Sequence, residues 1–129
     1  MNIAFIIDPL DSLKIYKDST FAMMREASLR GHALFALEQH ELFVRDKQVQ
    51  ASNRQLTLTG DENHWYRLGA TQISPLQQFD AVVMRKDPPF DSEYFYATHL
   101  LGQAERDGAR VFNKPSALRD HPEKLAILE

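Results

Sequence analysis

The sequence predicts an α/β protein whose sheet is mostly parallel and whose helices cover both faces of that sheet. Two short runs, residues 2–8 and 79–84, carry apolar side chains on both faces, which is typical of strands buried between layers. Each is followed by a segment with helical spacing of apolar residues, 18–31 and 91–108. The first helix leads to another strand-like run, residues 32–38, so the chain opens with the strand, helix, strand unit of a doubly wound fold.

The first predicted helix has clear end signals. Asp18 or Ser19 can act as its N-cap, and Met24 and Ala27 lie at the spacing that places them on one helical face. Gly31 follows as a residue that tolerates the left-handed conformation in which many helices end. The segment is therefore expected to be an amphipathic helix between two parallel strands.

The middle of the chain predicts an antiparallel hairpin inserted into this parallel arrangement. Residues 42–59 alternate between apolar and polar side chains, as strands with one buried face do. Asp46 and Lys47 interrupt the alternation and are expected to form the turn. We expect two short strands on either side of this turn.

The signal is weaker between residues 60 and 78. Residues 64–69 are interpreted as one helical turn, and Gly69 and Pro75 interrupt any longer element. No further strand is predicted before residue 79.

The last part of the chain resumes the alternation of strand and helix. The helix over 91–108 is capped by Asp91 or Ser92 and ends at Gly108, and residues 109–113 form the next strand. Beyond it we expect a brief helical turn. A final helix is expected from Asp120, which has capping-box spacing to Glu123.

Composition limits the classes of function. The chain has 129 residues, 43% of them hydrophobic and 26% charged, which fits one globular domain with its own core. It has no cysteine, which excludes disulfides and thiolate zinc sites and fits a reducing cytoplasm. The net charge of −3 and the lack of a basic stripe argue against a nucleic-acid partner. No segment has the length of a signal peptide core or a membrane span.

Charged side chains follow the predicted strands at their carboxyl ends. In open α/β sheets ligands bind at this edge, where helix N-termini also point. The cations expected there are Lys17, Arg85, Lys86 and Lys114. Together they would form a local positive field that suits a ligand bearing a carboxylate or a phosphate.

Arg85 is the leading candidate for ligand binding, because its planar guanidinium can hold a carboxylate through two hydrogen bonds. Neighbouring side chains on a strand point to opposite faces, so Arg85 and Lys86 cannot both face one ligand and one of them is structural. The alternative for Arg85 is an ion pair with Asp87 or Asp91 that ties down the loop. At the start of the first helix, Ser19 could bind an anion or only cap the helix.

Signatures of other site classes are missing from the sequence. It contains neither a P-loop nor a G-x-G-x-x-G motif, and its five histidines include no H-E-x-x-H pair. No G-x-S-x-G nucleophile elbow is present either. We therefore assign no catalytic residue and no metal ligand to this chain.

Several motifs in order along the chain resemble one family. They are "KDSTFAMM" at 17–24, "MRKDPPFD" at 84–91, "NKPSALRD" at 113–120 and "EKL" at 123–125. Together they closely resemble the N-terminal region of bacterial glutathione synthetases. The resemblance covers nearly the whole chain and is weakest over residues 39–78.

The resemblance implies a fold and a domain organisation. Residues 1–122 would form a three-layer, Rossmann-like pre-ATP-grasp domain that binds substrate. Residues 123–129 would be the first residues of an ATP-grasp domain that is otherwise absent, so the chain is expected to be a truncated piece.

The resemblance also implies an activity. The family enzyme is a cytoplasmic ATP-dependent carbon–nitrogen ligase that joins glycine to γ-glutamylcysteine through an acyl phosphate, giving glutathione, ADP and phosphate. Its cofactors are ATP and Mg²⁺, and the full-length protein is expected to be a homo-oligomer. The fragment alone is expected to be inactive and to bind no cofactor.

The residues that match the family motifs receive roles from the resemblance. Arg85 would bind the carboxylate of the peptide substrate, and Asp87 would orient Arg85 or the loop. Lys17 and Ser19 would line the same pocket, and Lys86 completes the expected substrate-binding set. Outside that set, Lys124 would lie near the ATP phosphates.

Two other functions remain open. One is a stand-alone, non-catalytic module that binds a small peptide or carboxylate at the same strand ends. The other is a different ATP-grasp ligase, which shares the fold but is expected to lack "MRKDPPFD". Whatever follows residue 129 would separate these possibilities.

Overall fold

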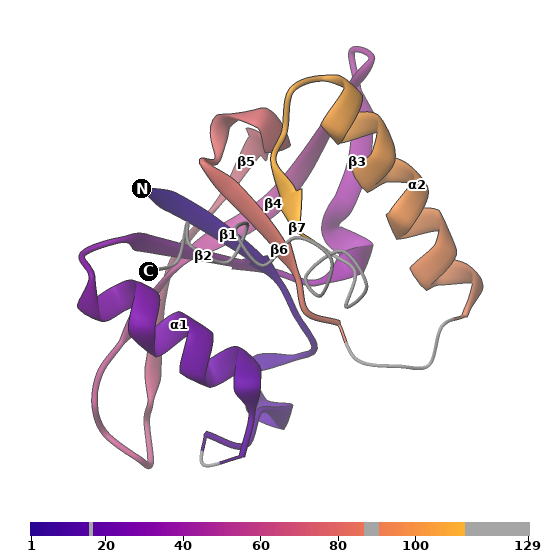
Figure 1. Ribbon diagram of the computed structural model, residues 1–129. Helices are drawn as coiled ribbons and strands as arrows, with labels where there is room; N and C mark the ends of the chain where they lie inside the picture. Colours follow the sequence, from indigo (N-terminus) through magenta and orange to yellow (C-terminus); the bar gives the residue numbers. More distant parts are fainter. Residues whose placement is uncertain (16, 87–90, 113–129) are drawn as a thin grey trace.

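The computed structural model describes residues 1–15, 17–86 and 91–112. In this part of the chain a seven-stranded mixed sheet is combined with two α-helices and three short 3-10 turns (Figure 1). The elements in chain order are β1 (Asn2–Ile6), η1 (Leu10–Ser12), α1 (Ser19–Leu29), β2 (Ala33–Leu37), η2 (Gln39–Glu41), β3 (Leu42–Arg45), β4 (Gln48–Leu58), β5 (Tyr66–Pro75), η3 (Leu76–Gln78), β6 (Ala81–Met84), α2 (Ser92–Arg106) and β7 (Val111–Phe112).

The parallel half of the sheet has the strand order β2, β1, β6, β7. β1 lies between β2 and β6, with Ile6 in register with Leu37 on one side and with Met84 on the other. Strand, helix and strand therefore follow one another as predicted, and the α/β, Rossmann-like fold with an antiparallel insertion is confirmed.

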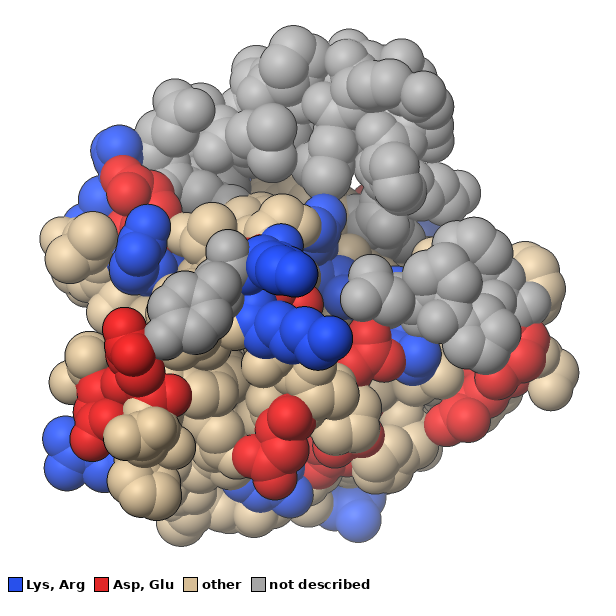
Figure 2. Space-filling model, turned by 90° about the horizontal axis from the view of Figure 1, so that it is seen from below, with Lys and Arg blue, Asp and Glu red and all other residues tan. Residues whose placement is uncertain are grey.

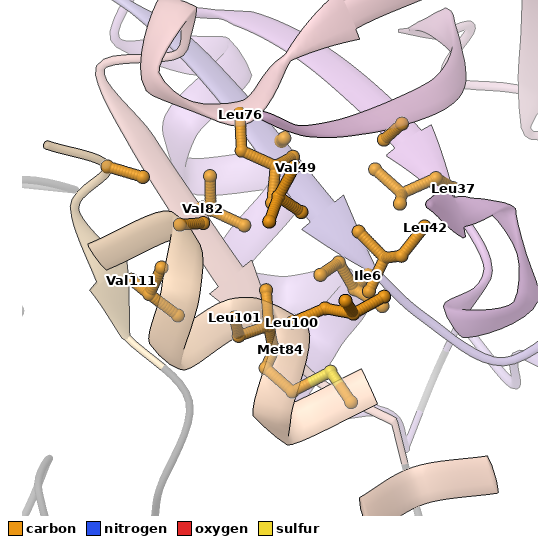
Figure 3. Packing of buried hydrophobic residues seen from close by; sticks show 14 of the residues in the cluster. Ile6, Leu37, Leu42, Val49, Leu76, Val82, Met84, Leu100, Leu101 and Val111 are labelled. Atoms are coloured by element: carbon orange, nitrogen blue, oxygen red, sulfur yellow. The ribbon is translucent and has the colours of Figure 1, made fainter. Parts of the chain in front are cut away.

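The two helices cover opposite faces of this sheet and make it the middle of three layers. Alternate residues of β1 point to opposite sides, so Ala4 and Ile6 belong to one core cluster, whereas Ile3 and Phe5 belong to the other. Figure 3 shows the first cluster, in which Ile6, Val82 and Met84 from the sheet lie close to Leu100 and Leu101 of α2. The second cluster packs against Met24 and Ala27 of α1, both of which have no exposed surface.

The predicted ends of both helices are confirmed, and the structure shows which residue caps each helix. The side chain of Asp18 accepts a hydrogen bond from the Thr20 amide, and the side chain of Asp91 accepts one from the Tyr94 amide. The aspartates, and not the serines that follow them, are thus the N-caps. Gly31 adopts a φ of +84° just after α1, as its expected C-terminal role requires.

The predicted hairpin is confirmed by β3 and β4, which pair antiparallel. Asp46 and Lys47 join these strands with φ values of +54° and +64°. Two consecutive positive φ angles are the geometry of the tight turn whose twist matches a hairpin.

The interpretation of residues 64–69 as a helical turn is wrong. Residues 66–69 are the start of β5, a ten-residue strand that pairs antiparallel with β4 from Tyr66 to Pro75. Gly69 does not end the strand. It lies at an irregularity in the pairing of β5 with β4, where the paired residues change from Thr71 and Arg54 to Leu68 and Leu56, and such a bulge lets the two strands continue on both sides of it. Pro75 stands at the last position of the strand.

β4 is the strand that joins the two halves of the sheet. Ala51 is in register with both Leu42 of β3 and Ser74 of β5, and Arg54 is in register with both Ala36 of β2 and Thr71 of β5. β3 and β2 therefore share one edge of β4, and β5 runs along the other. The elements predicted after residue 113 lie outside the described residues.

A candidate ligand site at the carboxyl ends of the parallel strands

The strands β1 and β6 end side by side, and both are followed by charged residues. The Arg85 amide donates a hydrogen bond to the Ile6 carbonyl over 2.8 Å, so the backbone just after β6 is still held to β1. Figure 2 views the molecule from the side toward which these strands run. Lys and Arg side chains gather near the middle of this face, with carboxylates around them. Arg85 and Lys86 directly follow β6 at this edge, and Lys114 lies outside the described residues, so the positive field formed by the four expected cations stays a prediction.

Arg85 reaches across to the first turn of α1. Its Nη2 donates to the Ser19 hydroxyl over 2.5 Å, and its Nε donates to the Thr20 hydroxyl over 3.2 Å. Among the described residues Arg85 forms no ion pair with Asp91, whose carboxylate instead caps α2. The alternative partner, Asp87, lies outside the described residues, so an ion pair between it and Arg85 stays a prediction.

Lys86 leaves the strand on the other side. Its Nζ lies 2.8 Å from the Asp8 carboxylate just beyond β1, and only 17% of the Lys86 side chain and 19% of the Asp8 side chain are exposed. Strand alternation therefore separates Arg85 and Lys86, as expected. This pair borders a cavity of about 200 Å³, whose wall also includes Glu38, His40 and Glu93.

The start of α1 holds Arg85 through side-chain hydroxyls. The Thr20 side chain is almost fully buried, with 4% of the residue exposed, whereas Ser19 is exposed. The Thr20 amide already donates to the Asp18 carboxylate over 2.8 Å. One amide of this helix end is therefore occupied by the protein's own anion, which lessens its capacity to bind a ligand anion directly.

Lys17 lies directly before Asp18, the N-cap of α1. Its side chain is exposed and lines a cavity of about 340 Å³ together with Lys14, Glu62 and Trp65. Asp87, Lys114 and Lys124 lie outside the described residues. The structure thus brings Arg85 and Ser19 together, while the substrate-binding roles of all the predicted residues, these two included, stay predictions.

A second polar group near the end of β1 was not predicted from the sequence. The Tyr66 hydroxyl donates to Asp11 over 2.7 Å, and Arg54 pairs with Glu41 at 3.4 Å. These side chains and Asp8 line a cavity of about 210 Å³. The hydrogen bond to Asp11, then burial and the charge of the Asp11 carboxylate, raise the pKa of Tyr66 above its ordinary value. No local pattern reveals this group, since β5 brings Tyr66 to Asp11 only through its pairing with β4.

The described residues include no group of three or more His, Cys, Asp or Glu side chains arranged to hold a metal ion. Within the same residues, no helix has the length and apolar character required to cross a membrane.

Comparisons with known proteins match this chain over nearly its whole length. A family model described as "Prokaryotic glutathione synthetase, N-terminal domain" matches residues 1–119. The chain is 59% identical to glutathione synthetase of Ralstonia nicotianae and 56% identical to that of Nitrosomonas europaea, covering all of this chain in both cases and 40% and 41% of those proteins. It is 42% identical to glutathione synthetase of Shewanella oneidensis over 97% of its own length. The chain thus spans about 40% of the length of these curated relatives.

Proposed function

Because the chain belongs to the family of prokaryotic glutathione synthetase N-terminal domains, we propose that it is the substrate-binding domain of an ATP-dependent ligase. The full-length enzyme would join glycine to γ-glutamylcysteine and release glutathione, ADP and phosphate. Residues 1–122 would form the substrate-binding domain. ATP and Mg²⁺ would be bound mainly by the rest of the enzyme, with Lys124 near the nucleotide phosphates.

The observation that carries the proposal is the placement of Arg85. Its backbone is held to β1 and its guanidinium to α1, at the edge of the sheet where α/β proteins bind ligands. The hydrogen bonds to Ser19 and Thr20 leave other guanidinium N–H groups that no described residue accepts. Those groups can hold a carboxylate through two parallel hydrogen bonds.

The chemistry of the reaction indicates which carboxylate Arg85 binds. The cysteinyl carboxylate attacks the γ-phosphorus of ATP, ADP leaves, and an acyl phosphate forms. The glycine amine then attacks the acyl carbon, phosphate leaves, and the amine loses a proton. The γ-glutamyl α-carboxylate takes no part in these steps and stays ionised throughout. We therefore assign it to Arg85, which holds the peptide in place for the reaction.

This assignment gives the other predicted residues supporting roles. Ser19 holds the guanidinium of Arg85, and Lys86 ties the segment after β6 to that after β1 through Asp8. Lys17 adds positive charge on the neighbouring loop. A homo-oligomeric, cytoplasmic enzyme is the corresponding expectation for the full-length protein.

The experiment is a coupled assay of ADP release by the full-length enzyme with ATP and Mg²⁺. We expect release that requires both γ-glutamylcysteine and glycine, and a peptide product with the mass of glutathione. Release that is independent of either substrate, or that starts with another amino acid in place of glycine, would contradict the proposed reaction.

A further inference from the structure

We propose that Thr20 is a positioning residue, whose buried hydroxyl sets the orientation in which Arg85 meets the substrate carboxylate. This inference rests on the proposed function of Arg85 and extends it to a residue that does not itself touch substrate. Thr20 and Arg85 are 65 positions apart in the sequence and are joined by the hydrogen bond from Arg85 Nε to Thr20 Oγ1.

The hydroxyls of Ser19 and Thr20 accept hydrogen bonds from the same edge of the Arg85 guanidinium. Nε and Nη2 lie on one side of the planar group, and they donate to Thr20 and Ser19 respectively. The terminal edge, formed by Nη1 and Nη2, keeps N–H groups without an acceptor among the described residues. The ligand carboxylate is therefore expected to bind end-on, in the plane that Thr20 and Ser19 define.

Thr20 is itself held firmly enough to act as a reference point. Thr20 is buried, with 4% of the residue exposed. Its amide is fixed by the carboxylate of Asp18, the N-cap of α1. The backbone of Arg85 is fixed independently by the hydrogen bond from its amide to the Ile6 carbonyl. Both ends of the Arg85 side chain are thus anchored, one to the sheet and one to the helix.

Anchoring matters because a free arginine side chain samples many rotamers, and a ligand must otherwise pay to order it. Removal of the Thr20 hydroxyl should leave Arg85 charged and present but poorly oriented. The substitution removes the hydrogen bond from the charged Arg85 guanidinium to the buried Thr20 hydroxyl. Hydrogen bonds to charged groups contribute more to stability than those between neutral groups.

The test compares Thr20→Val, which keeps the shape and removes the hydroxyl, with Thr20→Ser, which keeps the hydroxyl, in the full-length enzyme. Calorimetric titration with γ-glutamylcysteine should show about a tenfold weaker affinity for Thr20→Val. Thr20→Ser should bind like the wild type. The turnover number at saturating substrate should change little, because the substrate carboxylate is bound equally before and during the reaction.

A second ligand separates positioning from loss of structure. The analogue with its γ-glutamyl α-carboxylate converted to a primary amide should bind wild type much more weakly than γ-glutamylcysteine does. In Thr20→Val this preference for the acid should shrink by about the same tenfold factor, because only the acid uses the oriented Arg85. A purely structural defect would weaken both ligands equally and would overturn the inference.

Arg85→Ala and Ser19→Ala complete the design. If Arg85→Ala binds γ-glutamylcysteine like the wild type, the proposed carboxylate site fails and the role of Thr20 fails with it. If Arg85→Ala loses affinity but Thr20→Val does not, only the positioning role fails. Ser19→Ala measures how much the exposed hydroxyl on the same guanidinium edge contributes to the preference for the acid. Should Thr20→Val not fold, Thr20→Ala, which also removes the hydroxyl, takes its place, and an unchanged acid preference in that variant would overturn the inference.

Discussion

Replacement of Lys86 by methionine should destabilise this chain while leaving the affinity of the full-length enzyme for γ-glutamylcysteine nearly unchanged. Methionine preserves most of the aliphatic part of the side chain and removes the ammonium group. What is lost is the ion pair with Asp8, which ties the segment after β6 to the segment after β1.

The magnitude follows from the geometry of the pair. Two unit charges at the observed 2.8 Å attract each other by about 6 kcal/mol at an effective dielectric constant of about 20. Removing both groups from water offsets much of this, although each side chain keeps about a fifth of its surface exposed. Exposed pairs contribute about 0 to 1 kcal/mol, and loss of one partner of a buried pair costs about 3 to 5 kcal/mol. We expect an intermediate loss for Lys86→Met, about 1 to 3 kcal/mol.

The assay is urea denaturation of this chain, with Lys14→Met as the matched control because Lys14 is exposed and forms no ion pair among the described residues. A double-mutant cycle with Asp8→Asn isolates the pair from the other contacts of both residues. A parallel titration of the full-length variants with γ-glutamylcysteine measures binding. The reasoning would be refuted if Lys86→Met were as stable as Lys14→Met but bound the peptide at least tenfold more weakly.

Three further predictions concern the framework of the site. The pKa of Tyr66 is raised, so its neutral form stabilises the folded state below the ordinary tyrosine pKa, and this contribution should be lost as the pH rises through the raised value. Ultraviolet titration should show a tyrosine with a raised pKa in the wild type; Tyr66→Phe should remove this titration, and Asp11→Asn should move it toward the ordinary value. Leu101→Ala should cost about 3 kcal/mol in urea denaturation, because Leu101 is fully buried between α2 and the sheet, and a loss under 1 kcal/mol would argue against that packing. Replacing Asp46 and Lys47 by Asn-Gly should stabilise the chain by about 1 kcal/mol, since both positions have positive φ, and a destabilised hairpin would contradict the turn geometry.

The parallel half of the fold was predictable because its signals are local. Apolar runs with both faces buried identify β1 and β6, and aspartate caps with trailing glycines delimit both helices. The positive φ angles at Asp46 and Lys47 likewise match a turn that the polarity pattern had located.

β5 was not predictable in the same way. Most of its residues are exposed, so it lacks the alternation of apolar and polar side chains that marks a half-buried strand. Its existence depends on pairing with β4, which is a non-local interaction. The β-branched residues Thr71 and Ile73 were the available sequence signal, but Gly69 and Pro75 argued against a strand and decided the interpretation.

The candidate site was predictable in part. Strand alternation required Arg85 and Lys86 to separate, but it could not say which residue would reach α1 and which would reach Asp8. That outcome depends on the position of α1 over the sheet, which also makes Thr20 a partner of Arg85. The motif match pointed to Arg85 as a ligand residue, and only the three-dimensional arrangement pointed to the hydroxyls that hold it.

The central claim is that Arg85 binds a carboxylate of γ-glutamylcysteine, and the most direct measurement is a calorimetric titration of the full-length enzyme with this peptide. Wild type is compared with Arg85→Ala and with Arg30→Ala, a control at the far end of α1 whose arginine pairs with Glu26 on the surface. Loss of a charged, hydrogen-bonded contact predicts a weakening of about 2 to 5 kcal/mol for Arg85→Ala and almost none for Arg30→Ala. Equal affinities of Arg85→Ala and the wild type would contradict the claim.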